Sequence, residues 1–155
     1  MNFYLKQKVF SWRDKFEVYD VSGRPLYYAE GEIFSLGKHL RLYDLSGRAT
    51  AAIDQQLFRL RATFDVSRCG RALAVVRKVW SLFCEDYEIE GIGWYVHGDV
   101  FGHDYVLSGA DGRILARIHK QWLAWGDTYE IAVENGADEV SVLAIVLAID
   151  ATLDD

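Results

Sequence analysis

VSVLAIVLAI, residues 140–149, is the stretch from which the fold of this chain can be worked out. Ser141 is its only polar member, so a helix built on it is apolar on every side rather than on one face. Such a helix is buried all round, either in a protein core or in a membrane. A membrane span needs about 20 apolar residues, so this shorter run predicts a core helix. Asp138, just upstream, is the predicted N-cap.

The chain before this helix is predicted to form short β-strands. In 127–133, Tyr129, Ile131 and Val133 alternate with other residues, which is typical of a strand with one buried face. A barrel of eight strands holds only its own side chains, whereas one of about eleven can enclose a helix. We therefore expect a mainly β fold, a closed antiparallel barrel of about twelve strands around the C-terminal helix. The predicted strands are 2–8, 15–20, 25–31, 39–44, 49–55, 57–66, 71–80, 86–91, 94–100, 104–108, 113–122 and 127–133.

A repeated hairpin supports this prediction. YDVSGR (19–24) and YDLSGR (43–48) are nearly identical, and weaker echoes follow at 65–71 and 108–113. Gly23 and Gly47 are expected to supply the positive φ that such turns need. One hairpin cannot bury its own apolar face, so the repetition indicates a meander or barrel.

Composition indicates a single domain over residues 1–155. Hydrophobic residues make up 51% and charged residues 26% of the chain, as in soluble globular proteins. The N-terminus lacks an apolar core of signal-peptide length, and no segment is long enough to span a bilayer. Two cysteines, Cys69 and Cys84, make a disulfide framework improbable and favour a reducing cytoplasm. We expect a cytoplasmic monomer that also has access to the membrane periphery.

Six segments together carry a resemblance to a known family. They are YLKQKVFSWRDKFEVYD (4–20), GEIFSLGKHLRLYD (31–44), QQLFRLRATFDV (55–66), GHDY (102–105), WLAWGDTYEI (122–131) and VLAIVLAID (142–150). In this order they resemble the LURP-one-related family, particularly its small bacterial, YxjI-like members. The resemblance implies the tubby C-terminal-like fold, a closed twelve-stranded barrel threaded by a hydrophobic C-terminal helix.

The wider superfamily includes tubby proteins, which bind phosphoinositides, and the phospholipid scramblases. Fold kinship does not transfer function. This sequence shows neither the cysteine-rich palmitoylation stretch nor the acidic calcium loop of scramblases, and it lacks the N-terminal regulatory region of tubby proteins. Arg59-Leu60-Arg61 is only an analogue of the lipid-binding Lys-x-Arg-type pair of tubby proteins.

Basic residues gather in the middle of an acidic chain. The net charge is −6, and no Lys or Arg follows Lys120. Bulk nucleic-acid binding is therefore disfavoured, whereas a local anion site is compatible with this pattern. Arg59 and Arg61 share one parity of the predicted strand 57–66, so both should face solvent and could hold a phosphate bidentately. Pairing with carboxylates of neighbouring strands is the alternative. The candidate anion or lipid-binding residues are Arg59, Arg61, Arg68, Arg71, Arg77 and Lys78.

Catalytic signatures such as GxSxG, GxxxxGK[ST], HExxH and CxxC are absent from the sequence. His97, Asp99, His103 and Asp104 could ligate a metal if two strands converged, but solvated residues around a turn are favoured, so no metal and no cofactor are predicted. The tryptophans Trp12, Trp80, Trp94, Trp122 and Trp125 are expected mostly in the core, with Trp122 or Trp125 as the candidate for ligand or membrane contact.

A non-enzymatic binding module for anionic phospholipid headgroups or another phosphorylated ligand is the function that these features favour. The alternative is a structural or protein-interaction barrel without a small-molecule ligand. Enzymatic activity is not expected, because a barrel filled by a helix leaves no large internal pocket.

Overall fold

The computed structural model describes residues 1–155 apart from 9–14, 33–35, 81–84, 100–103, 122–127 and 154–155. The described residues form twelve strands and one helix. These are β1 (Asn2–Gln7), β2 (Lys15–Tyr19), β3 (Pro25–Gly31), β4 (His39–Asp44), β5 (Ala49–Gln55), β6 (Thr63–Arg68), β7 (Arg71–Trp80), β8 (Glu85–Glu90), β9 (Tyr95–Asp99), β10 (Asp104–Ser108), β11 (Ile114–Gln121), β12 (Thr128–Val133) and α1 (Glu139–Leu153).

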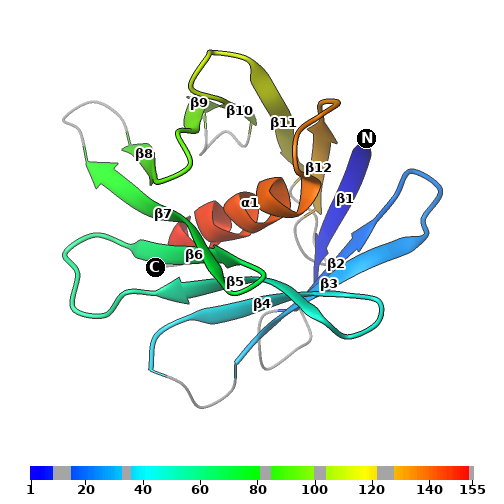
Figure 1. The fold of residues 1–155 in the computed structure, drawn as a ribbon, viewed down its shortest axis with the longest axis horizontal. Coiled ribbons are helices and arrows are strands. Elements are labelled where there is room, and N and C mark those ends of the chain that lie inside the picture. The colour runs from blue at the N-terminus through cyan, green and yellow to red at the C-terminus, as the bar shows by residue number, and fades with distance from the viewer. Residues whose placement is uncertain (9–14, 33–35, 81–84, 100–103, 122–127, 154–155) are drawn as a thin grey trace.

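The strands form one antiparallel sheet that curls around α1 (Figure 1). Strands that are consecutive in the sequence pair with each other, except β8 with β9, and β1 also pairs with β12. The sheet therefore runs β8-β7-β6-β5-β4-β3-β2-β1-β12-β11-β10-β9. Its edge strands β8 and β9 approach each other, but no ladder joins them in the described part of the chain. The predicted barrel of twelve strands around a terminal helix is confirmed, with a seam at β8 and β9.

The helix α1 is buried from Val140 to Thr152. The inward side chains of the strands pack against it, so the apolar side chains on all its faces are buried within the protein. Asp138 caps its start by accepting hydrogen bonds from the backbone N–H and the hydroxyl of Ser141. Arg68 donates two hydrogen bonds to the same carboxylate, from Nε at 2.6 Å and from Nη2 at 3.1 Å. The predicted N-cap is confirmed, and Arg68 belongs to it.

The end of the helix is held by polar contacts within the barrel. Asp150 accepts a short hydrogen bond from the hydroxyl of Tyr129 and lies 3.7 Å from the ammonium of Lys120. Thr152 donates to the hydroxyl of Tyr87 at 3.1 Å. An acidic group near a helix C-terminus opposes the helix dipole, so the neighbouring Lys120 compensates an otherwise unfavourable charge.

The two YD-x-SGR hairpins have the same turn. Gly23 and Gly47 have φ values of 81° and 84°, in the left-handed region that favours glycine. Asp20 in the first turn and Asp44 in the second accept hydrogen bonds from the backbone N–H groups of the serine and the arginine that follow them. A similar closure occurs at 109–113, where the Gly112 N–H donates to the carbonyl of Gly109 at 3.0 Å. The repeat prediction is confirmed.

The two ends of the barrel differ in their connections. The turns that follow β2, β4 and β6 span 20–24, 45–48 and 69–70, whereas β5 and β6 are joined by the longer loop 56–62. Successive connections of an antiparallel sheet alternate between its two ends, so the 56–62 loop lies at the end opposite those turns. The end of α1 lies there as well, because Thr152 lines a hollow shared with Ala62 and Lys78.

The predicted strand 57–66 is wrong in its first half. β6 begins only at Thr63, and Leu57–Ala62 form a loop closed by a 2.8 Å hydrogen bond from the Gln56 N–H to the Thr63 carbonyl. Phe58 has a φ of 58°, which no strand accommodates. The alternation of Phe58 and Leu60 with arginines imitates a strand, although neither side chain is buried.

Candidate functional site

The β5–β6 loop presents large apolar side chains to solvent. Phe58 and Leu60 are fully exposed, and Leu57 is 43% exposed. Single exposed apolar residues are ordinary on protein surfaces, but a contiguous group marks an interaction site. Phe58 also occupies the left-handed region, where a bulky side chain is strained. Strain of this kind is concentrated at functional sites.

The neighbouring β3–β4 connection adds to this surface. Leu36 is 81% exposed, and a Cβ placed on the adjacent Gly37 would lie 2.9 Å from Leu57 Cδ2, so the two loops are in contact. His39, on β4, contacts the Leu36 carbonyl oxygen through its Nε2 at 2.8 Å. Its Nδ1 lies 2.6 Å from the Asp54 carboxylate oxygen on β5. Leu36, Leu57, Phe58 and Leu60 form a surface that we call the apolar rim.

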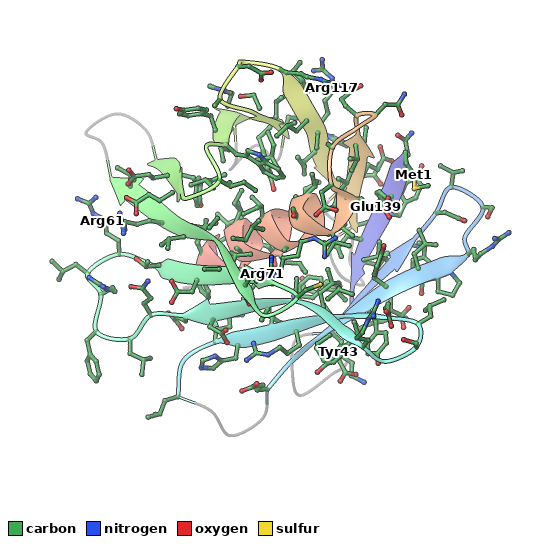
Figure 2. The ribbon with its side chains drawn as sticks, viewed as in Figure 1. Met1, Tyr43, Arg61, Arg71, Arg117 and Glu139 are labelled. Atoms are coloured by element: carbon green, nitrogen blue, oxygen red, sulfur yellow. The ribbon has the colours of Figure 1, made fainter. Side chains whose placement is uncertain are left out.

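Three basic residues accompany the apolar rim. Arg59, Arg61 and Lys78 line one hollow of about 270 Å³ together with Gln56 and Thr152. The Nε of Arg59 donates to the Gln56 side-chain oxygen at 2.9 Å, and Arg59 has no ion pair within the described residues. Arg61 has no hydrogen bond or ion pair within the described residues, and Figure 2 shows it at the periphery of the molecule. Arg59 and Arg61 lie together, but on a loop rather than on the predicted strand.

The other three predicted anion-binding residues lie elsewhere. Arg68 is engaged by Asp138, whose pKa its hydrogen bonds lower to about 2. Arg71 follows the turn at the opposite end of the barrel, and Figure 2 shows it well separated from Arg61. Arg77 lies within 3.3 Å of Glu88 and Glu90 on β8, which is the kind of carboxylate pairing predicted as the alternative for Arg59 and Arg61. The six residues therefore do not form one basic strip.

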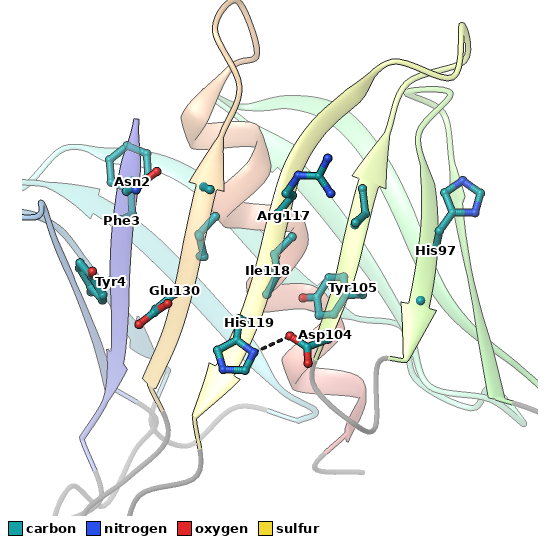
Figure 3. A pocket seen from close by; sticks show the side chains of 14 residues that line it. Asn2, Phe3, Tyr4, His97, Asp104, Tyr105, Arg117, Ile118, His119 and Glu130 are labelled. Carbon is teal, nitrogen blue, oxygen red and sulfur yellow. Dashed lines mark hydrogen bonds and ion pairs between the residues drawn. The ribbon is translucent and has the colours of Figure 1, made fainter.

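A second hollow, of about 450 Å³, lies on the outer face of β1, β12, β11, β10 and β9 (Figure 3). The polar residues that line this hollow include Asn2, Arg117, Glu130, His119 and Asp104. His119 Nδ1 makes a short contact with the Asp104 carboxylate. No pattern in the sequence predicts this hollow, because its residues come from five strands and meet only through the sheet register.

The predicted histidine and aspartate group does not assemble a metal site in the part of the chain that the structure describes. His97 contacts the Ser108 hydroxyl at 3.0 Å, while Asp104 is engaged by His119. His103 lies outside the described residues, as do Cys84, Trp12, Trp122 and Trp125. Among the tryptophans, Trp94 is partly buried against the core, as expected for most of them.

Within the described ranges, no helix combines the length and apolarity needed to cross a membrane.

Comparisons with known proteins agree on the fold. A family model described as LURP-one-related matches residues 1–150. The Bacillus subtilis (strain 168) protein YxjI, itself uncharacterised, is 29% identical over 150 residues, which cover 97% of this chain and 92% of that protein. An X-ray structure of a protein from Arabidopsis thaliana superposes with a TM-score of 0.66 at 16% identity, covering 96% of this chain and 90% of that one. At that identity the likeness concerns the fold alone.

Proposed function

The chain belongs to the LURP-one-related family, and from that premise we propose that it is a non-enzymatic binding module for anionic phospholipid headgroups. The contact surface is the apolar rim together with Arg59, Arg61 and Lys78. The aromatic and aliphatic side chains enter the headgroup layer, while the basic groups meet lipid phosphates. In this proposal the protein is cytoplasmic and binds the membrane peripherally.

The observation that carries the proposal is the alternation of Phe58 and Leu60, both fully exposed, with Arg59 and Arg61. Apolar side chains interspersed with basic ones are the composition that binds an anionic membrane interface. A rim built for carboxylate pairing alone would need no exposed apolar groups, and a purely apolar docking surface would need no unpaired arginines.

Magnitudes decide whether such a loop can hold an acidic protein on an acidic membrane. Fully burying a Phe or Leu side chain contributes roughly 1.5–3 kcal/mol. Each Lys or Arg near an anionic surface adds about 1 kcal/mol within a Debye length. The net charge of −6 opposes the approach, but salt screens those acidic groups that lie farther from the membrane than a Debye length. The local attraction therefore exceeds the repulsion at modest salt concentration.

Vesicle co-sedimentation tests the proposal. The wild-type chain is mixed at low salt with phosphatidylglycerol-containing vesicles and, separately, with vesicles of phosphatidylcholine alone. We expect binding to the anionic vesicles, weakened by added salt. The double variants Arg59→Gln/Arg61→Gln and Phe58→Ser/Leu60→Ser should each lose that binding while keeping their melting temperature.

Matched controls come from the opposite end of the barrel. Val21 and Leu45 are also exposed, at 70% and 62%, and lie in the two repeated turns, so Val21→Ser/Leu45→Ser removes comparable apolar surface. Arg48→Gln/Arg71→Gln removes two positive charges, as Arg59→Gln/Arg61→Gln does. Both controls should bind like the wild type. A wild-type chain that does not sediment with anionic vesicles at low salt overturns the proposal, and the protein-interaction barrel then becomes the leading interpretation.

A further inference from the structure

The hollow on the outer sheet face is built from two rows of side chains that cross five strands. Strand register places Asn2, Ala132, Arg117, Val106 and His97 in the first row. The second row contains Tyr4, Glu130, His119 and Asp104. Both rows point away from α1, because the residues between them, Phe3, Ile131, Ile118 and Tyr105, are buried in the core.

Small side chains create the hollow. Ala132 separates Asn2 from Arg117 in the first row, and paired strands lie about 4.8 Å apart, so the two polar groups stand roughly two strand spacings from each other. Ala132 and Val106 provide apolar surface on either side of Arg117 in this row. The volume, about 450 Å³, lies within the roughly 300–1,000 Å³ of small-molecule sites.

The charges around the hollow are separated rather than paired. Arg117 is exposed and has neither a hydrogen bond nor an ion pair within the described residues. Glu130 accepts one hydrogen bond, from Gln121 at 3.2 Å. Diagonal neighbours on paired strands are within reach of long side chains, yet Figure 3 shows Arg117 leaning toward β10 and Glu130 leaning toward β1. A positive group in the first row and a negative group in the second row therefore face solvent without pairing with each other.

We propose that this hollow binds a small zwitterion, a free amino acid or a similarly dipolar molecule. The guanidinium of Arg117 receives the ligand carboxylate, for which its planar donors are suited. Glu130 receives the ammonium group, and Asp104, held by His119, is a second acidic group in the same row. The apolar part of the ligand lies over Ala132, which is beside both Arg117 and Glu130.

Charge complementarity selects this class of ligand over singly charged ones. A phosphate or another simple anion would meet two carboxylates, Glu130 and Asp104, beside the guanidinium. A simple cation would meet Arg117. A dipolar ligand satisfies both poles at once, and each pole disfavours the ligands that fit only the other. This inference does not rest on the proposed membrane contact, because the hollow and the apolar rim share no residues.

Ligand-observed NMR with the twenty common amino acids as separate probes tests the inference. We expect saturable binding of at least one of them. Acetate and methylammonium, which each carry one pole of the ligand, should bind about tenfold more weakly or not at all. Arg117→Gln and Glu130→Gln should each weaken the dissociation constant by about tenfold or more.

Two exposed charges outside the hollow provide matched controls. Arg48→Gln and Glu134→Gln should leave amino-acid binding unchanged, and circular dichroism should show that all four variants are folded. The inference is overturned if no amino acid binds at millimolar concentration, or if binding is equal in the wild type and in both hollow variants. Tighter binding of acetate than of any amino acid would also overturn it, because the hollow would then be an anion site.

Discussion

Replacing Phe58 by glycine should stabilise the fold and weaken membrane binding in the same molecule. Phe58 is fully exposed, so its removal costs little packing, and its φ of 58° is a conformation that only glycine adopts freely. The left-handed region costs a non-glycine residue about 1–2 kcal/mol. Glycine also loses roughly 0.5–1 kcal/mol through the greater freedom of the unfolded chain.

The two effects leave a net stabilisation of up to about 1.5 kcal/mol, which corresponds to an increase in melting temperature of up to roughly 3–6 °C in a protein of this size. The loss of the aromatic side chain from the headgroup layer removes roughly 1.5–3 kcal/mol, or about tenfold or more in vesicle affinity. Urea unfolding and vesicle sedimentation on the same preparation measure both quantities.

Phe58→Ala separates the backbone from the side chain. Alanine keeps the strained conformation but lacks the ring, so this variant should lose vesicle binding without the increase in stability. A lower melting temperature for Phe58→Gly would refute the reasoning about strain, because it would show that the ring packs against the protein. Unchanged vesicle affinity for both variants would refute the role of Phe58 at the membrane.

Three further predictions concern the barrel and its rim. Leu143→Ala, inside the barrel, should reduce the free energy of unfolding by about 2–5 kcal/mol, and a smaller loss in urea titration would mean that α1 is not tightly enclosed. Gly47→Val should cost more than about 1 kcal/mol because of the φ of 84°, whereas Ser46→Ala beside it should cost less; equal losses would contradict the turn argument. His39 contacts acceptors through both ring nitrogens, the Asp54 carboxylate and the Leu36 carbonyl, with Arg41 and Glu32 nearby; the hydrogen bond to Asp54 raises its pKa above 6.5. The stabilisation that comes with this raised pKa is fully present below pH 6.5 and is lost as the pH rises through the pKa of the folded state. The melting temperature of the wild type should therefore fall as the pH rises from 6.5 through that pKa, and it should fall less in His39→Gln.

The sequence predicts those features that depend on one local pattern. The apolar run at 140–149 could be satisfied only inside a wide barrel, and the repeated YD-x-SGR turns carry their own glycine and aspartate. The sequence predicts a strand in place of the β5–β6 loop, because Phe58 and Leu60 alternate with arginines as buried residues would. Their exposure follows from the left-handed backbone at Phe58, which residue type does not reveal.

Features that depend on several strands lay beyond the sequence pattern. The predicted basic strip does not form, because β6 and β7 are joined as a hairpin. Arg68 and Arg71 lie beside the turn of that hairpin, at the end of the barrel opposite Arg59 and Arg61. The hollow at Arg117 and Glu130 requires the register of five strands, drawn from both ends of the chain. Neighbours along the chain carry no information about either arrangement.

The depth of residue 58 in an anionic membrane tests the proposed function most directly. A nitroxide is attached to Phe58→Cys in a chain whose Cys69 and Cys84 are replaced by serine, and its accessibility to oxygen and to a water-soluble nickel complex is measured by electron paramagnetic resonance. With phosphatidylglycerol vesicles, we predict that the label becomes more accessible to oxygen and less accessible to nickel, while a label at Leu45→Cys stays in water. A label at residue 58 that remains as accessible to nickel as the one at residue 45, with the protein bound to the vesicles, would contradict insertion of the apolar rim.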